Sequence, residues 1–477
     1  MLISMVFIFI IGYLCIALEH TLKVNKSAPA LLTGTLLWVI YMFGATEFVP
    51  TVSAHEFNVF LANNPRFTNL PLAQQCINFV TNHQILDSIG EISETLIFLI
   101  GAMLTVELID AHGGFNFITN RITTRKKRKL LWLIATLTFF MSAVLDNLTT
   151  SIVMVMLISK LIKNKQERWL FGGIIIIAAN SGGAWSPIGD VTTIMLWIRG
   201  NISTGATIPN LLIPCLISAI VPVFLIQRKL TGAFEVSNER EACHIDDPIR
   251  KMKRKKRITI LVMGLSSLLF VPVFKTVTHL PPFIGMLFGI SLMWIYTELS
   301  NKREFNLSDK QKPTVAKVIH RIDGATLLFF LGILLAVDTL KYSGILNSFS
   351  AMLDTYVGNV YAVNIIIGLL SSIIDNVPLV AAAIGMYPIA DQAMVAAAAN
   401  PEYLSNFVQD GTFWQFLTYC AGVGGSSLII GSAAGVIVMG LEKISFMWYI
   451  KNISLLAVAG YLAGAAWYIV QNTLIHG

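Results

Sequence analysis

Residues 142–150 read Ser-Ala-Val-Leu-Asp-Asn-Leu-Thr-Thr, and residues 371–379 read Ser-Ser-Ile-Ile-Asp-Asn-Val-Pro-Leu. Each segment sets a carboxylate–amide pair, Asp146-Asn147 or Asp375-Asn376, inside an otherwise apolar stretch. A charge at membrane depth costs about 3 kcal/mol or more, so it is rarely kept without a function. Because the two pairs have similar surroundings, they indicate a duplicated chain with a cation site near the middle of a bilayer.

The composition places the chain in a membrane. Of its 477 residues, 55% are hydrophobic and 13% are charged, whereas soluble domains carry about 25% charged residues. The mean hydropathy is +0.70. A spanning helix needs about 20 apolar residues, so the chain has room for about a dozen spans. We therefore predict an all-α polytopic membrane protein without a separate soluble domain.

Basic residues are concentrated in alternate connectors. They cluster near residues 121–129, 163–168, 250–257 and 302–321, whereas few occur near residues 48–88, 200–208, 275–282 and 341–358. Since positive charges mark cytoplasmic loops, this pattern predicts a multi-pass protein of the cell inner membrane whose basic loops touch the lipid bilayer. Membrane orientation thus accounts for the net charge of +7, and no nucleic-acid partner is expected.

Cysteine usage and the N-terminal segment exclude two further classes. The five cysteines show no CxxC spacing and no neighbouring histidine cluster, so we expect neither a disulfide framework nor a zinc site. No cofactor is predicted. Residues 1–18 lack a basic n-region and a small-residue cleavage site, which favours a retained helix over a signal peptide.

Two apolar runs, residues 130–162 and 358–390, contain Asp-Asn near their middle. A helix of this length would extend about 50 Å, too long for a hydrocarbon core about 30 Å thick. We therefore predict that each run forms a re-entrant helical hairpin that turns at Asp-Asn. Backbone breaks at this depth are tolerated only where protein or water satisfies the freed polar groups.

Two further runs, residues 169–198 and 411–440, are interrupted by Gly-Gly and small hydroxyl residues. Glycine and proline favour an unwound segment between two half-helices. The free carbonyl groups of such a segment can coordinate a cation. Each of these runs is therefore expected to form a broken transmembrane helix.

The topology divides the chain into four parts. They are N-terminal transmembrane helices with an external connector (1–88), a first repeat (89–228), basic cytoplasmic loops with two linking helices (229–322), and a second repeat with a C-terminal helix (323–477). Counting from the basic connectors, the first hairpin opens toward the cytoplasm and the second opens toward the opposite side. The two repeats are therefore predicted to be inverted copies, each with a re-entrant hairpin and a broken helix.

The paired Asp-Asn hairpins and the Ser-Gly-Gly…Ser-Pro-Ile-Gly-Asp-Val-Thr-Thr break at residues 181–193 resemble those of NhaD-type sodium/proton antiporters. These belong to the ion transporter (ArsB/NhaD) superfamily, which also contains arsenite pumps and dicarboxylate carriers. The resemblance is strongest over residues 89–440 and implies that hairpin tips meet broken helices at one central site. The dicarboxylate carriers have Ser-Asn-Thr at the tips, which differs from Asp-Asn-Leu-Thr and Asp-Asn-Val-Pro here.

The predicted site offers the oxygen ligands that a sodium ion prefers. The candidate ion- and proton-binding residues are Asp146, Asn147, Thr149, Thr150, Asp375, Asn376, Ser181, Gly182, Gly183, Ser186, Asp190, Gly424, Gly425, Ser426 and Ser427. Sodium itself is expected at the two Asp-Asn pairs. Because burial and a nearby like charge both favour a protonated carboxyl group, a proton can compete with the cation there.

This competition predicts a secondary active transporter rather than an enzyme. It would exchange cytoplasmic sodium, or lithium, for external protons by alternating access and would serve pH homeostasis. A homodimer is expected only by analogy with related transporters.

Structural roles compete with the proposed chemical ones. The hairpin aspartates could merely cap helices, and Asp190 is balanced between capping and ion binding. Glu94 is a candidate proton relay. Glu107 and Asp338, near the ends of their spans, are expected to be solvated. The hydroxyls of residues 192 and 193 could bond to their own helix backbone.

Two other functions remain as alternatives. An arsenite-type or other anion/proton-coupled carrier of the same superfamily would share the fold. An intramembrane aspartyl protease would also need two aspartates within the membrane, sharing a proton, but the Gly-x-Gly-Asp pattern expected near one of them is missing, since residues 187–190 read Pro-Ile-Gly-Asp.

Overall fold

The computed structural model describes residues 1–17, 19–115, 124, 126–230, 232–234, 254–302, 313–373, 375–398 and 400–476. Its regular elements within these residues are all helices, so the predicted all-α class is confirmed. The chain forms two compact units. Unit 1 comprises residues 1–97, 323–363 and 377–408, and unit 2 comprises residues 98–322, 364–376 and 409–477. Each predicted repeat contributes to both units.

Among the described residues, seven helices are long and apolar enough to cross a membrane. They are Leu72–Ala111, Lys127–Leu145, Thr204–Lys229, Arg254–Thr278, Pro282–Asn301, Gly324–Tyr342 and Phe446–Leu474. An eighth span results if Ser27–Phe43 and Ala45–Val52, which are bent by 86°, are counted together. The chain is therefore a multi-pass membrane protein.

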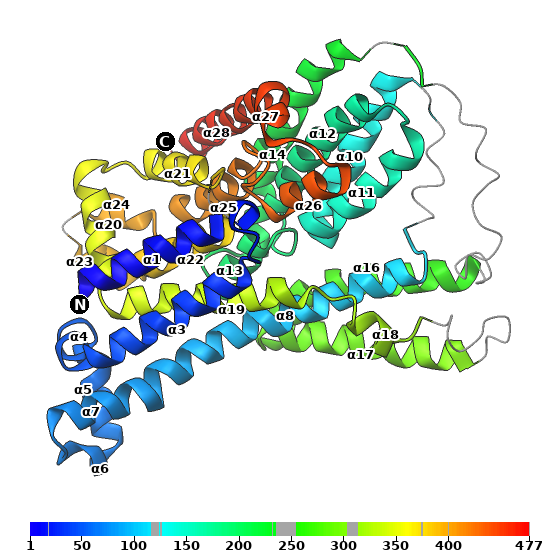
Figure 1. The fold of residues 1–477 in the computed structure, drawn as a ribbon. Coiled ribbons are helices and arrows are strands. Elements are labelled where there is room, and N and C mark those ends of the chain that lie inside the picture. Colours follow the sequence, from blue (N-terminus) through cyan, green and yellow to red (C-terminus); the bar gives the residue numbers. More distant parts are fainter. Residues whose placement is uncertain are drawn as a thin grey trace. The chain divides into compact units, whose positions relative to one another are not determined.

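Unit 1 begins with α1 (Leu2–Ala17) and the short α2 (Glu19–Leu22). The next helix, α3 (Ser27–Phe43), packs against α1 and against α19 (Gly324–Tyr342), as Figure 1 shows. Unit 1 also contains α20 (Ile345–Tyr356), α23 (Gln392–Ala397) and α24 (Pro401–Ser405). Segments far apart in sequence thus build this unit.

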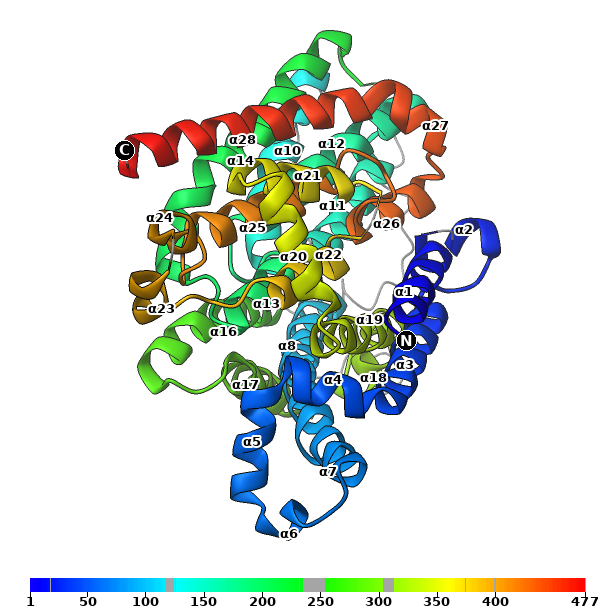
Figure 2. The same ribbon diagram turned by 90° about the vertical axis from the view of Figure 1, so that its left-hand side faces the viewer.

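Residues 45–84, most of the expected external connector, are largely helical. They form α4 (Ala45–Val52), α5 (Ala54–Asn63), α6 (Pro65–Thr68) and α7 (Leu72–Phe79), of which the last three lie together in Figure 2. A π-helical turn, Val80–Gln84, joins α7 to α8 (Ile85–Ala111). The span expected to start at residue 89 therefore starts earlier.

Buried hydrogen bonds explain why this polar sequence can be helical and packed. Tyr41 donates to Oε1 of Gln84 at 2.9 Å, and the Gln84 amide donates to Ser53 at 3.2 Å. Ser88 donates to Oδ2 of Asp338 at 2.5 Å. Asp338 is only 7% exposed, so the expectation that it is solvated was wrong. A polar group is tolerated in such a position because its partner replaces water.

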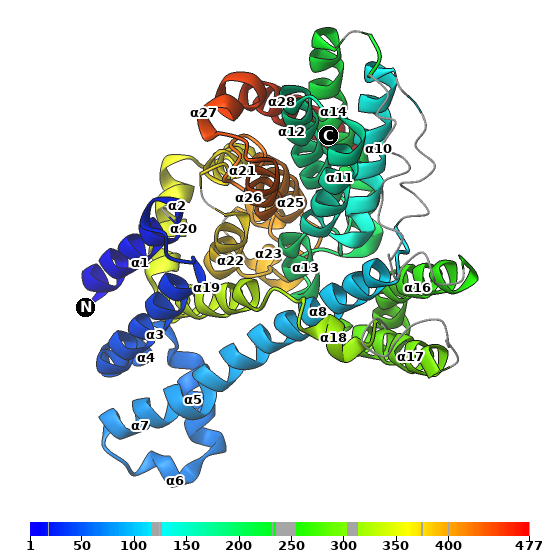
Figure 3. The ribbon, with the colours of Figure 1, turned by 45° about the vertical axis from the view of Figure 1, so that its right-hand side comes forward.

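Unit 2 contains the first predicted hairpin, which is built from α10 (Lys127–Leu145) and α11 (Asn147–Leu161). The two helices are separated by Asp146, whose φ of 74° and ψ of 160° end α10. Both helices pack against α12 (Lys165–Ala184), as Figure 3 shows. The break therefore falls at the Asp-Asn pair, where the sequence predicts the turn.

The remaining helices complete the description. They are α13 (Val191–Ile198), α14 (Thr204–Ile226), the 3-10 turn Gln227–Lys229, α16 (Arg254–Thr278), α17 (Pro282–Lys302), α18 (Val315–Ile319), α21 (Val360–Leu370), α22 (Asn376–Met386), α25 (Thr412–Gly424), α26 (Ala433–Glu442), α27 (Phe446–Tyr449), the π-helical turn Ile450–Ser454 and α28 (Leu455–His476). Within unit 2, α14 packs against α28 and α16 packs against α17.

In unit 2, the helix before each Asp-Asn pair makes the same two contacts with the helix before the corresponding Gly-Gly break. Ser142 donates to the carbonyl oxygen of Ala179 at 2.6 Å, and Ser371 donates to that of Ala421 at 2.8 Å. A Cβ atom on Gly182 would lie 2.1 Å from the carbonyl oxygen of Phe139. A Cβ atom on Gly424 would lie at the same distance from the carbonyl oxygen of Gly368. Glycine is required where two backbones approach this closely.

Gly182→Ala is therefore expected to destabilise the protein by about 2 kcal/mol or more, because the new methyl group has to displace a rigid backbone carbonyl. The midpoint of thermal unfolding in detergent measures this effect. Gly205→Ala is the matched control, since its Cβ atom would meet nothing within 4 Å. Equal midpoints for the two variants would contradict the close approach.

Candidate functional site

The first broken helix is interrupted between α12 and α13, and Asp190 is the residue that precedes α13. Its Oδ1 accepts hydrogen bonds from the backbone N–H and the hydroxyl of Thr192, both at 2.9 Å. The side chain of Thr193 in turn accepts from the backbone N–H of Asp190 at 3.2 Å. This capping box satisfies backbone donors at the start of the half-helix, so the capping role considered for Asp190 is present.

The Asp190 carboxylate also holds the two hairpin tips. The side-chain amide of Asn147 donates to Oδ2 of Asp190 at 2.5 Å. The side-chain amide nitrogen of Asn376 donates to the same carboxylate, at 3.3 Å from Oδ1 and 3.4 Å from Oδ2. Asp190 is 1% exposed. Two amides from segments distant in sequence thus converge on a single buried carboxylate that also caps a helix.

The two hairpin aspartates are less enclosed than Asp190. Asp146 and Asp375 are both partly exposed. Asp146 accepts hydrogen bonds from the backbone N–H of Thr149 at 2.7 Å and from its hydroxyl at 3.0 Å. Each of the two aspartates directly precedes an asparagine that donates to the Asp190 carboxylate. Three carboxylates therefore meet in this part of unit 2, and together they attract cations.

The backbone of Asp146 is strained. Its φ of 74° and ψ of 160° lie in a region that is essentially restricted to glycine, at a cost of about 1–3 kcal/mol. The strain places the carboxylate where its oxygens cap α11. Strained backbone of this kind is concentrated at functional sites.

Asn180 joins the cluster, although the sequence did not identify it as a site residue. Its Oδ1 accepts from Asn147 at 3.1 Å, and its Nδ2 donates to the hydroxyls of Ser426 at 3.0 Å and Ser432 at 2.9 Å. Ser432 caps α26 through the backbone N–H of residue 435. The available signal was a lone amide at the end of a long apolar run.

Two of the predicted hydroxyl residues point elsewhere. Ser181 accepts a hydrogen bond from Ser218 of α14 at 2.8 Å. The Ser186 hydroxyl accepts from the backbone N–H of Ile188 at 3.4 Å, inside the break itself. The hydrogen bonds of these two serines shape the surroundings of the cluster and do not reach the Asp190 carboxylate.

The remaining hydroxyls differ in their partners. The side chains of Thr150 and Ser427 are buried and have no hydrogen-bond partner among the described residues. Thr193 donates to the backbone carbonyl of Asp190 at 2.7 Å, as expected for backbone bonding. The expectation of backbone bonding was wrong for Thr192, whose hydroxyl donates to the Asp190 carboxylate.

Paired glycines let both breaks fold tightly. A Cβ atom on Gly183 would lie 2.4 Å from the carbonyl oxygen of Gly189, and one on Gly425 would lie 2.7 Å from that of Gly431. Because these residues have no side chain, the backbone before each break can approach the backbone after it closely. These glycines therefore act through backbone geometry.

Glu94, the candidate proton relay, is a partly exposed residue of α8. It belongs to unit 1, whereas Asp190 and its partners belong to unit 2. A relay role for Glu94 stays a prediction.

A multi-pass bundle with broken helices and charged side chains at their ends defines a class of protein. Such breaks are tolerated inside a membrane where they line a substrate or ion pathway. Carboxylates buried in a membrane protein mark the same kind of function. The fold and the cluster are typical of membrane transporters.

Comparison with known proteins specifies the family. Residues 6–408 match the citrate transporter family. Sodium/proton antiporter 1 of Arabidopsis thaliana is 42% identical over 475 residues, which cover 99% of this chain and 73% of that protein. Sodium/proton antiporter 2 of the same plant is 40% identical over 98% of this chain and 99% of its own length. The Na(+)/H(+) antiporter NhaD of Vibrio cholerae is 29% identical over 98% and 91%, respectively.

The chain therefore belongs to the citrate transporter family. The resemblance to NhaD-type sodium/proton antiporters is confirmed by these relatives.

Proposed function

We propose that this protein is a secondary active transporter that exchanges sodium ions for protons. The observation that carries the proposal is the buried Asp190 carboxylate, to which Asn147 and Asn376 of the two hairpin tips both donate. A buried charge in a membrane protein carries a large free-energy cost, which an ion or proton bound to it would reduce. The relatives named as sodium/proton antiporters support the same substrate pair.

The cluster offers the ligands of a hard cation. Carboxylate oxygens come from Asp146, Asp190 and Asp375, and amide oxygens come from Asn147 and Asn376. Sodium and lithium are both bound by such oxygens. We therefore include lithium as a second transported cation.

Coupling follows from competition for the same carboxylates. A carboxylate that holds a proton no longer attracts the cation, and a bound cation disfavours the proton. If the empty, deprotonated cluster crosses the membrane poorly, each passage carries either a cation or protons. Exchange then needs one site that faces each side in turn.

Alternating access is supported by the recurrence of the same contacts at both breaks. Ser142 and Ser371 bond to carbonyls of their neighbouring helices, and Asp190 and Ser432 cap the half-helices α13 and α26. We propose that these correspondences reflect two inverted repeats. Such repeats allow two conformations that mirror each other across the membrane.

The placement of the basic connectors predicts the orientation of the protein in the membrane, and the ion gradients set the direction of exchange. With those connectors in the cytoplasm, we assign the protein to the cell inner membrane. Inward proton flow would then drive sodium out of the cytoplasm and would serve pH homeostasis.

Citrate is the alternative substrate suggested by the family's name. An organic anion with several carboxylates would meet Asp146, Asp190 and Asp375, whose like charges repel it. The cluster thus favours a cation over citrate.

Everted vesicles that contain the protein test the proposal. With an imposed proton gradient, sodium and lithium are expected to dissipate the gradient, whereas potassium, citrate and arsenite are not. A pH-sensitive dye measures the change, and vesicles without the protein are the control. A response to citrate or arsenite without a response to sodium would contradict the proposal.

A further inference from the structure

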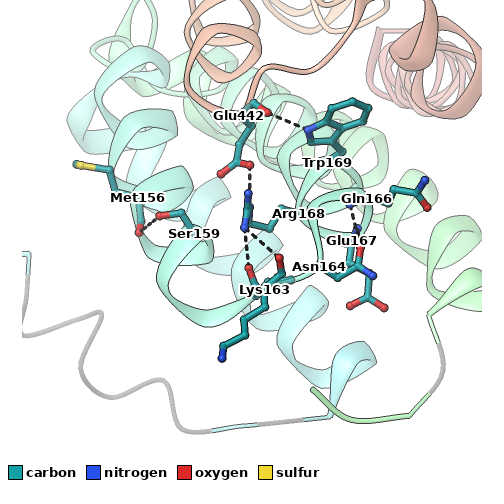
Figure 4. A network of polar contacts seen from close by, with 10 residues as sticks. Met156, Ser159, Lys163, Asn164, Gln166, Glu167, Arg168, Trp169 and Glu442 are labelled. Carbon is teal, nitrogen blue, oxygen red and sulfur yellow. Dashed lines mark hydrogen bonds and ion pairs between the residues drawn. The ribbon is translucent and has the colours of Figure 1, made fainter. Parts of the chain in front are cut away.

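Arg168, near the start of α12, joins three segments of unit 2 (Figure 4). Its Nε donates to Oε2 of Glu442 at 2.8 Å. Its Nη1 donates to the carbonyl oxygens of Ile162 and Lys163, both at 3.2 Å. One guanidinium group of the first broken helix therefore contacts both the end of the first hairpin and the last residue of α26.

The neighbouring indole holds the same glutamate by its backbone. Trp169 donates to the carbonyl oxygen of Glu442 at 2.9 Å (Figure 4). Its ring packs edge-on against Trp448, with 5.1 Å between the ring centroids. Because α26 ends at Glu442, both the side chain and the terminal carbonyl of that helix are fixed by consecutive residues of α12.

The opposite end of α26 lies at the polar cluster. Ser432, which precedes the helix, accepts a hydrogen bond from Asn180 of α12 at 2.9 Å. Between the ends, a Cβ atom on Gly172 would lie 3.2 Å from Val438 of α26. A ten-residue helix extends only about 15 Å, so α12 and α26 are joined at both ends and in contact between them.

We propose that Arg168 is a positioning residue, which fixes α26 against α12 so that Ser432 stays in place beside Asn180. This inference rests on the proposed cation exchange for its transport readout. The Arg168–Glu442 pair holds throughout the transport cycle, and the two broken helices move as one body. Removing one partner would leave the other charge poorly compensated and would release the end of α26.

A second ion pair in unit 2 provides a matched control. Lys127 of α10 and Glu167 of α12 lie 2.5 Å apart, with side chains that are 19% and 22% exposed. The Glu442 side chain is only 4% exposed. The control pair connects α10 to α12 and does not involve α26, so its loss should leave the position of Ser432 unchanged.

The first test compares E442Q, E442D and E167Q in sodium-dependent exchange. E442Q is expected to raise the sodium concentration for half-maximal exchange by about tenfold, with little change in the rate at saturating sodium. E442D, which keeps the charge, should show a smaller rise, and E167Q should stay within about twofold of the parent protein. An E442Q protein with the parent's half-saturating sodium concentration would overturn the proposal.

The second test fixes the contact covalently with G172C and V438C. Oxidation should join α12 to α26, because the two positions are close enough for a disulfide. The cross-linked protein is expected to retain at least about half of its exchange rate. If cross-linking stops exchange, the contact must open during transport and the proposal is wrong. The variants that carry G172C alone or V438C alone, treated with the same oxidant, control for oxidation at the five native cysteines.

Hydrogen exchange measured by mass spectrometry separates this inference from the proposed function. In the purified protein, E442Q should accelerate amide exchange in residues 433–442, and E167Q should not. This result needs no transported ion. If the parent protein fails to exchange sodium but E442Q loosens α26, the proposed function fails and the positioning role stands. Unchanged amide exchange in E442Q would overturn the positioning role itself.

Discussion

Asp190→Asn is expected to lower the initial rate of sodium-dependent proton exchange by about 100-fold or more. The substitution removes a buried charge to which Asn147 and Asn376 donate. Hydrogen bonds to charged groups contribute about 1.5–3 kcal/mol each, so the loss of both costs about 3 kcal/mol or more. A loss of that size corresponds to about 100-fold. Exchange in everted vesicles at equal protein amounts measures the effect.

This substitution also separates ion binding from helix capping. Asparagine caps a helix about as well as aspartate, so the start of α13 and the capping box with Thr193 should persist. The midpoint of thermal unfolding in detergent should therefore stay within a few degrees of the parent's. Near-normal exchange in Asp190→Asn would show that Asp190 acts as a cap alone.

Asp146→Gly is expected to lower the rate of exchange strongly while raising stability. Glycine adopts the φ of 74° and ψ of 160° without strain, which gains about 1–3 kcal/mol, whereas glycine at an N-cap costs only a few tenths. We expect a net gain of about 1 kcal/mol. Because the carboxylate is lost from the cluster, exchange should fall by about 100-fold. Thermal unfolding and vesicle assays on the same preparations measure both quantities.

Asp410→Gly is the matched control for this prediction. Asp410 also has a positive φ, 63°, and its Oδ1 accepts a hydrogen bond from the backbone N–H of Ser203 at 2.6 Å. It lies outside the polar cluster, so its replacement should leave exchange within about twofold of the parent rate. Equal loss of exchange in both variants would mean that the effect of Asp146→Gly arises from the backbone rather than the carboxylate.

The position of the first break could be predicted from the sequence because a charge within an apolar run is conspicuous. Asp146 marks the end of α10, and the Gly-Gly motifs mark the ends of α12 and α25. These are local signals, since backbone breaks are set by the residues at the break. The positions of the broken helices followed from them, whereas the helical class followed from the composition.

The partners within the cluster could not be predicted in the same way. Asn180 bonds to Ser426 and Ser432, more than 200 residues away along the chain. A sequence pattern does not encode such long-range pairs. For this reason the sequence could not decide whether Asp190 caps a helix or binds an ion. The helices of residues 45–84 were missed for a related reason. The side chain of Gln84 is hydrogen-bonded by Tyr41, which lies on another helix.

Because two asparagines share the Asp190 carboxylate, a change in the charge of that carboxylate affects both hairpin tips. Both amides donate to Oδ2 of the same carboxylate, and a charged acceptor forms stronger hydrogen bonds than a neutral one. When a proton neutralises that group, both bonds weaken in the same event. If Asp190 takes up the exchanged proton, as we propose, that single protonation therefore acts on both hairpin tips at once.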